Sequence, residues 1–403
     1  MIALCGEVLT GRASIPDGVV LIDGEQVVAI GSAAEVSIPP GADRALAAYV
    51  APGYVELQLN GAFGHDFHAD PASAAKVAAL LPATGVTSFL PTLISSSRAA
   101  LEPKLAALRS IRTAPGAARS LGVHLEGPWL SPRRVGAHDP GALELPPRSA
   151  DSISNAVEID KPVGACADWL VAAGVRLVTL APELSGALDL ARALIDRGVV
   201  VSAGHTDATV EQAQAAIAAG IHLCTHLFNA MPALHHRAPG AAGAYLAAAG
   251  PAVGLIADGV HVHPAMVEVV RRCKAVGKVV LVTDAMAAAG MPAGRSMLAG
   301  REVIVDHTSA RLPDGTLAGS TLTLDAAVRN YRKFTNCDAA EAVAAATLAP
   351  ALALGDARLG RLFVGGPADA LLLDRDLFVQ AAFIAGARAA SRSAPARGPR
   401  AAP

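Results

Sequence analysis

Short runs of β-branched and aliphatic residues alternate with Ala- and Leu-rich stretches through the middle of the chain. The stretches between the runs, such as 71–85 and 209–220, carry small apolar residues at helical intervals. The runs are VELQL (55–59), VTSFL (86–90), LGVHL (121–125), VRLVTL (175–180), VVVSAG (199–204), IHLCTH (221–226), VGLIAD (253–258) and VVLVTD (279–284). Eight strands alternating with helices predict an α/β fold, a (β/α)₈ TIM-like barrel. A doubly wound sheet is the alternative, but no G-x-G-x-x-G follows the first run.

The two ends of the chain show a different pattern, in which short apolar runs are separated by turn residues. Asp-Gly turns divide the β-branched runs of IPDGVVLIDGEQVVAIG, and residues 365–386 have the same texture. We therefore expect a small β-sandwich domain built from both chain ends, 1–50 and 356–386, around a barrel at 51–355. Residues 387–403 are rich in Ala, Arg, Pro and Ser, which predicts a disordered tail.

Composition narrows the class of protein. Of the 403 residues, 52% are hydrophobic and 17% are charged, which excludes a disordered chain. The net charge of -2 without basic blocks argues against binding to nucleic acid or to a membrane surface. No apolar run approaches the ~20 residues that span a bilayer, and MIALCGEVLTGR has no signal-peptide pattern, so we expect a cytoplasmic enzyme. The five cysteines are scattered without C-x-x-C, which argues against a disulfide framework or a thiolate zinc site.

Ionisable residues stand at or just after the ends of several predicted strands: Glu126, His205, His226, Asp258 and Asp284. In a barrel these positions converge on one mouth, where active sites of this fold lie. Any one of them alone would more often be a satisfied polar group. Two imidazoles and one carboxylate, however, leave an open position on Zn²⁺ or Fe²⁺, as a catalytic metal site requires. Asp284, one strand further, could then take a proton from the water at that position.

Eight motifs in order carry a family resemblance. They are PGYVELQLNG (52–61), VTSFLPTLISS (86–96), HLEGPWL (124–130), GHTDAT (204–209), THLFNAMPALHHRAPG (225–240), ADGVHVH (257–263), TDAM (283–286) and LAGST (317–321). Together they resemble the N-acetylglucosamine-6-phosphate deacetylase family of the amidohydrolase superfamily. The resemblance implies hydrolysis of the acetamide of N-acetyl-D-glucosamine 6-phosphate to D-glucosamine 6-phosphate and acetate, in amino-sugar catabolism or recycling.

The resemblance also implies the metal site and the catalytic group. Glu126, His205 and His226 match the family's ligands to one divalent metal per subunit, with Zn²⁺ expected first and Fe²⁺, Co²⁺ or Mn²⁺ as alternatives. Asp284 matches the catalytic carboxylate, which takes a proton from the attacking water and delivers it to the leaving amine. One carboxylate can act as base and then as acid within a turnover.

A larger set of positions is implied for substrate binding. It comprises Ala137, His138, Asn229, Ala230, Arg237, Asp258, Gly259, Val260, His261, Leu317, Ala318 and Gly319. Either His261 or His138 is expected to donate to the developing oxyanion. Asn229, the backbone of Ala230 and Arg237 are expected to bind the phosphate, since the planar guanidinium suits phosphate oxygens. In this family the arginine reaches into the neighbouring subunit's site, so the resemblance implies a homodimer.

The first strand departs from the superfamily pattern. Most amidohydrolases place H-x-H there for a second metal, whereas this chain has Gln58 and Asn60, which points to a single metal. The role of His65, which follows in AFGHDF, stays open. Two alternative functions also stay open: deacetylation of the galactosamine epimer, and a catalytically silent sugar-phosphate-binding protein. The intact Asp284 argues against the silent protein.

Overall fold

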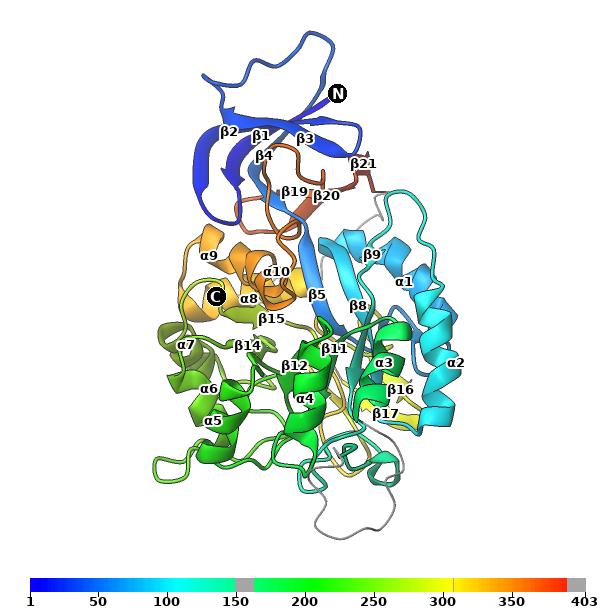
Figure 1. Ribbon diagram of the computed structural model, residues 1–403. Helices are drawn as coiled ribbons and strands as arrows, with labels where there is room; N and C mark the ends of the chain where they lie inside the picture. Colours follow the sequence, from blue (N-terminus) through cyan, green and yellow to red (C-terminus); the bar gives the residue numbers. More distant parts are fainter. Residues whose placement is uncertain (149–162, 307, 390–403) are drawn as a thin grey trace.

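The barrel is the centre of the molecule in the computed structural model, which describes residues 1–148, 163–306 and 308–389 (Figure 1). Its parallel strands follow one another in the order β5 (Tyr54–Leu59), β8 (Val86–Ile94), β10 (Val123–Glu126), β11 (Val175–Leu180), β12 (Val200–Ala203), β13 (Leu223–Cys224), β14 (Ala252–Leu255) and β15 (Val279–Leu281). The short β9 (Arg119–Ser120) pairs with β8 beside this path. Each of the eight predicted strands is present, which confirms the barrel.

The barrel closes between its first and last strands just beyond β15. The backbone N–H of Asp284 donates to the carbonyl of Gln58 at 3.0 Å, and that of Asn60 donates to Ala285 at 2.8 Å. The closure therefore brings the end of the first predicted strand directly against the Asp284 segment.

Helices cover the outside of the barrel (Figure 1). They are α1 (Ala74–Leu80), α2 (Arg98–Arg109), α3 (Val163–Ala172), α4 (Ala187–Ile195), α5 (Val210–Ala218), α6 (Gly240–Ala247), α7 (Pro264–Cys273), α8 (Leu324–Thr335), α9 (Ala339–Ala344) and α10 (Leu348–Ala353). The expected helix at 209–220 is α5, which begins at a capping box between Thr209 and Gln212. None of the helices in the described ranges is long and apolar enough to cross a membrane.

Both chain ends contribute to one seven-stranded sheet, as the pattern of their runs predicted. From the N-terminal end it takes β1 (Ile2–Leu9), β2 (Ser14–Asp23), β3 (Gln26–Ser32) and β4 (Asp43–Pro52), and from the C-terminal end β19 (Ala370–Leu373), β20 (Val379–Ile384) and β21 (Ala387–Arg388). Apolar side chains from both groups, including Leu4, Val50 and Phe383, pack in one cluster. The domain limits at 50 and 355 stay a prediction. The predicted disordered tail begins too early, because Ala387 and Arg388 pair with β20 as strand β21; residues 390–403 of that tail lie outside the described residues.

A small three-stranded sheet between β15 and α8 was not anticipated from the sequence. It consists of β16 (Gly294–Leu298), β17 (Arg301–Val305) and β18 (Ala310–Arg311). Its apolar side chains, among them Leu298 and Val303, pack against Met286, just after the Asp284 segment. The sheet therefore forms one wall of the barrel mouth.

Candidate active site

A cavity of about 440 Å³ opens at the carboxyl ends of the barrel strands. Its wall includes Asn60, Ile94, Glu126, Gly136, Ala137, His138, His205, His226, Asn229, Ala230, His261, Asp284, Leu298, Arg311, Thr316, Leu317 and Gly319. Most of the predicted site residues are thus brought together. The exceptions are Arg237, Asp258, Gly259, Val260 and Ala318, which do not line it.

The chain turns sharply where it delivers the central residues into the cavity. His205, His226 and Asp284 have φ values of 47°, 26° and 50°, in the left-handed region that non-glycine residues rarely adopt. Each residue held in this left-handed conformation destabilises the folded state by about 1–3 kcal/mol, and such residues are typical of functional sites. It also explains why β13 and β15 end earlier than the sequence pattern suggested.

Three atoms that could bind a metal lie close together in the cavity wall. Glu126 Oε1 lies 3.3 Å from His205 Nε2 and 3.0 Å from His226 Nε2, and the two nitrogens lie 3.2 Å apart. All three side chains are at most 5% exposed. Burial by itself raises the pKa of Glu126, but hydrogen bonds and charge from the two histidines hold it well below its ordinary value. The same carboxylate raises the pKa of His226 against the effect of burial.

The orientation of His205 suits metal binding. Its Nδ1 lies 2.8 Å from the carbonyl oxygen of Arg134, and because a carbonyl can only accept, Nδ1 carries the proton. Nε2 therefore presents a lone pair to the cluster, which is how a ligating histidine is usually held. The arrangement of two imidazoles and a carboxylate fits a divalent cation of the transition series.

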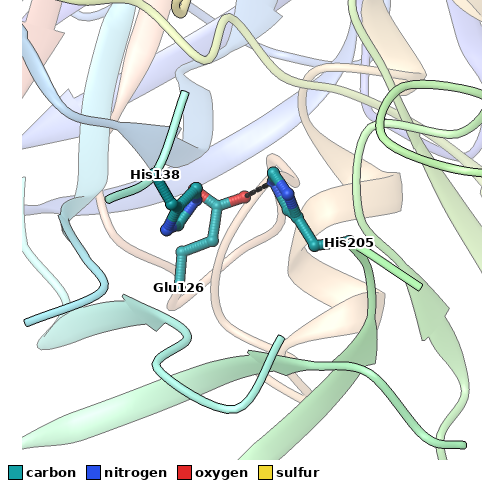
Figure 2. A group of neighbouring side chains, drawn as sticks. All are labelled: Glu126, His138 and His205. Carbon is teal, nitrogen blue, oxygen red and sulfur yellow. Dashed lines mark ion pairs between the residues drawn. The ribbon is translucent and has the colours of Figure 1, made fainter. Parts of the chain in front are cut away.

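His138 adjoins this group and was expected only at the substrate. Ligand atoms of Glu126, His138 and His205 lie within 4.8 Å of one another (Figure 2). Burial, together with the charge of the neighbouring His205, lowers the pKa of His138 to about 3, so the ring is neutral. The described residues therefore include a Glu/His/His cluster that could hold a metal, with His226 as an additional histidine.

A chain of buried hydrogen bonds runs across the barrel beneath the cluster. His124 Nδ1 lies 3.0 Å from the carbonyl oxygen of Leu57 and so donates to it, which leaves Nε2 to accept from the Thr179 hydroxyl at 2.8 Å. Thr179 Oγ1 in turn lies 2.7 Å from Thr225, which lies 2.6 Å from Ser202. The chain of hydrogen bonds joins β5, β10, β11 and β12 to Thr225, the residue after β13. It thereby fixes the segments from which Glu126 and His226 enter the cavity.

The amides of the first strand point at carboxylates. Asn60 Nδ2 donates to Asp284 Oδ1 at 2.7 Å, while Gln58 Nε2 donates to the same oxygen at 3.3 Å and to Glu126 Oε1 at 3.0 Å. Gln58 and Asn60 therefore direct side-chain N–H groups at the carboxylates of Glu126 and Asp284. Burial, together with the charge of Glu126, raises the pKa of Asp284 to about 6.

A second histidine of the wall is held by a carboxylate. His261 Nδ1 lies 2.6 Å from Asp258 Oδ2, and Asp258 Oδ1 accepts the backbone N–H groups of Val260 and His261 at 2.8 Å. Burial raises the pKa of Asp258, but the hydrogen bond and charge of His261 outweigh it and lower the value. Asp258 was expected to contact substrate; the structure places it behind His261, which lines the cavity.

The expected phosphate residues lie in a more open region. Asn229 turns its amide nitrogen back to the carbonyls of His226 and Leu227, at 3.2 and 3.3 Å. Arg237 is exposed in the stretch 233–238 and does not line the cavity of its own chain. Arg311, which the sequence did not indicate, does line it and donates to Gly315 O at 2.9 Å. It lies six residues before the expected Leu317.

His65, whose role was open, lies outside the cavity wall. It pairs with Ala62 in the hairpin of β6 (Gly61–Ala62) and β7 (His65–Asp66).

Comparison with known proteins identifies the family. A model of the amidohydrolase family matches residues 49–393. The chain belongs to this family. It is 38% identical over 352 residues to the zebrafish (Danio rerio) N-acetylglucosamine-6-phosphate deacetylase, covering 84% of this chain and 83% of that protein. It is 39% identical to an N-acetylgalactosamine-6-phosphate deacetylase of Escherichia coli O157:H7, covering 94% of this chain and 98% of that protein.

A solved structure agrees in both fold and family. A mutant N-acetyl-D-glucosamine-6-phosphate deacetylase of Mycobacterium smegmatis, in complex with N-acetyl-D-glucosamine-6-phosphate, superimposes with a TM-score of 0.86 at 36% identity. The match covers 97% of this chain and 99% of that one. The resemblance to deacetylases of the amidohydrolase family is therefore confirmed.

Proposed function

We propose that this amidohydrolase removes the acetyl group of N-acetyl-D-glucosamine 6-phosphate by metal-dependent hydrolysis, giving D-glucosamine 6-phosphate and acetate. The observation that carries the proposal is the meeting of Glu126, His205, His226 and Asp284 in one cavity. The relatives named as deacetylases of this sugar phosphate support it.

Glu126, His205 and His226 would hold one divalent cation per chain, with zinc as the first candidate because two nitrogens and one oxygen leave a tetrahedral position open. When bound, such a cation supplies Lewis acidity toward a carbonyl oxygen and acidifies a water molecule. The amides of Gln58 and Asn60 donate N–H groups to the neighbouring acids, which supports a single cation.

Asp284 would move the proton. Both first-strand amides donate to its Oδ1, so Oδ2 stays available to a ligand of the cavity. A buried carboxylate with a raised pKa can accept a proton from water and return it to the amine nitrogen as the C–N bond breaks.

His138 and His261 would act on the acyl carbonyl. Both are buried histidines of the cavity wall, and each is held at Nδ1 by a neighbour, so Nε2 is the atom that faces a ligand. A preorganised N–H donor stabilises the negative charge that develops on the carbonyl oxygen. His138 carries such a proton on Nε2 in the neutral ring, whereas His261, whose Nδ1 proton is directed at the Asp258 carboxylate, donates from Nε2 only as the imidazolium.

The phosphate would be bound at the open region, by Asn229, by the backbone of Ala230 and by Arg237 of a second subunit in a homodimer. The exposure of Arg237 and its absence from its own chain's cavity support this arrangement. Since a phosphorylated sugar does not cross a membrane unaided, we also propose a cytoplasmic location.

The test is an acetate-release assay on N-acetylglucosamine 6-phosphate, N-acetylgalactosamine 6-phosphate and free N-acetylglucosamine, each with and without chelator. We expect the first substrate to give the highest kcat/KM and chelator to abolish turnover. A preference for the second would favour the activity of the Escherichia coli relative, which covers nearly the whole chain. Stoichiometric binding without acetate release would favour a silent binding protein.

A further inference from the structure

His138 lies where proximity alone would make it a metal ligand. Its Nε2 is 3.8 Å from Glu126 Oε2, and its ring packs edge-on against that of His205, with centroids 4.5 Å apart. Figure 2 shows both rings on either side of the carboxylate. These distances therefore do not decide whether His138 is a metal ligand. What decides it is which of its two ring nitrogens carries the proton.

The contacts of His138 Nδ1 settle which nitrogen carries the proton. The backbone N–H of Ser95 donates to Nδ1 at 3.3 Å, and the Ser95 hydroxyl lies 2.8 Å from it. A backbone N–H can only donate, so Nδ1 must accept, and the hydroxyl donates to it as well. In a neutral imidazole the proton is then on Nε2. His205 is the reverse case, because the carbonyl of Arg134 requires its Nδ1 to carry the proton.

We propose that Ser95 is a positioning residue that holds His138 as an Nε2–H donor, outside the metal's ligand set and directed at the substrate. The claim that His138 is directed at the substrate rests on the proposed function. The claim that His138 is not a metal ligand does not. The Ser95 hydroxyl lies against Gly127, where any side chain would collide with it, because a Cβ at this position would clash with Ser95 Oγ. Gly127 has a φ of 82°, so the backbone there also favours glycine.

The zinc affinity of His138 variants distinguishes a hydrogen-bond donor to the substrate from a metal ligand. His138→Gln keeps an N–H group near the position of Nε2, whereas the shorter His138→Asn does not. We expect both variants to bind zinc within about threefold of the wild-type affinity, and His205→Gln to lose at least about tenfold. The Gln variant should keep more deacetylase activity than the Asn variant. A loss of zinc affinity in both His138 variants similar to that of His205→Gln would overturn the proposal.

The tautomer can be observed without turnover. In zinc-loaded protein labelled with ¹⁵N-histidine, the signals of His138, assigned by their loss in His138→Gln, should show a proton on Nε2 and a bare Nδ1. A proton on Nδ1, or a metal-coordinated Nε2, would contradict the proposal. Failure of the proposed function alone would leave this pattern intact, so the two failures are distinguishable.

The role of Ser95 itself is tested by Ser95→Ala, with the adjacent Ser96→Ala as control. Removal of one of the two hydrogen bonds to Nδ1 should lower kcat/KM roughly fivefold, with zinc content unchanged. Ser96→Ala should stay at the wild-type value. Equal activity of the two variants would remove the Ser95 hydroxyl from this role.

Discussion

The site has a buried end, formed by Glu126, His205, His226 and Asp284, and a loop end, formed by residues 229–238 and 311–317. Of the loop end, Asn229, Ala230, Arg311, Thr316 and Leu317 line the cavity. Glu126 and His226 are each 3% exposed, whereas Leu234 in the loop end is 42% exposed. Side chains of the buried end contact one another across strands, because barrel closure forces those strands together. The loop end turns its polar groups to its own backbone or to solvent. The barrel therefore fixes the chemistry of the site, while the loops leave recognition to be completed by substrate or by a second chain.

The largest effect is expected for Asp284→Asn at the buried end. Loss of the proton acceptor should lower kcat by about 10²–10⁴-fold, the usual contribution of a general base, with metal content unchanged. Steady-state acetate release and metal analysis check this. Asp356→Asn, a change outside the cavity wall, is the control and should turn over like the wild type. Turnover within tenfold of the wild type for Asp284→Asn would remove this residue from the mechanism.

Asn60→Ala should have the next largest effect. It removes the 2.7 Å hydrogen bond to Asp284 Oδ1, so the carboxylate loses its main orienting donor. Outer partners of this kind contribute about 10–100-fold, and we expect that loss in kcat with KM little changed. Gln380→Ala, an exposed amide of β20, is the matched control. A change in KM alone would mean that Asn60 contacts substrate instead.

Arg237→Ala tests the loop end. A charged hydrogen bond to phosphate contributes about 1.5–3 kcal/mol, so KM for the phosphorylated sugar should rise by about 10–100-fold. KM for the unphosphorylated sugar should be unchanged. Arg311→Ala is the matched variant and should have a smaller effect, because its guanidinium already donates to Ser309 Oγ and Gly315 O. A larger rise in KM for Arg311→Ala than for Arg237→Ala would mean that the phosphate binds to Arg311 of the same chain.

The smallest effect on turnover is expected at Glu56, which lies beside the buried end and accepts the backbone N–H of Thr283; a change there alters stability instead. Burial raises the pKa of Glu56 to about 8, above its unfolded value, so the folded protein binds an extra proton between pH ~4.5 and ~8. The stability this contributes is present below that window and is lost as pH rises through it, by at most about 1.4 kcal/mol per pH unit.

Glu56→Gln should remove that part of the pH slope, as urea unfolding at pH 5, 6, 7 and 8 would measure. Asp314→Asn, an exposed carboxyl of the loop end whose pKa is lowered by hydrogen bonds from Thr316, should keep the wild-type slope. An unchanged slope in Glu56→Gln would mean that Glu56 is ionised throughout this range.

The two ends also differ in how far the sequence predicted them. Parallel strands buried on both faces read as continuous apolar runs, so the eight strands and the residues that follow them were predictable. The left-handed φ values of His226 and Asp284 shortened the strands, which no residue pattern indicates. Nor does the sequence reveal that Ser95 contacts His138, since such a contact between residues distant in sequence depends on the packing of two loops. Arg311 was missed because its strand has only two residues, too few to show a pattern of apolar and polar positions.

The central claim is that Glu126, His205 and His226 form one metal site that makes the cavity catalytic. The most direct test is to strip the protein with chelator and titrate zinc back while measuring acetate release from N-acetylglucosamine 6-phosphate. Activity should rise linearly and reach a plateau at about one zinc per chain. Activity that survives chelation, or that requires two zinc ions per chain, would contradict the account.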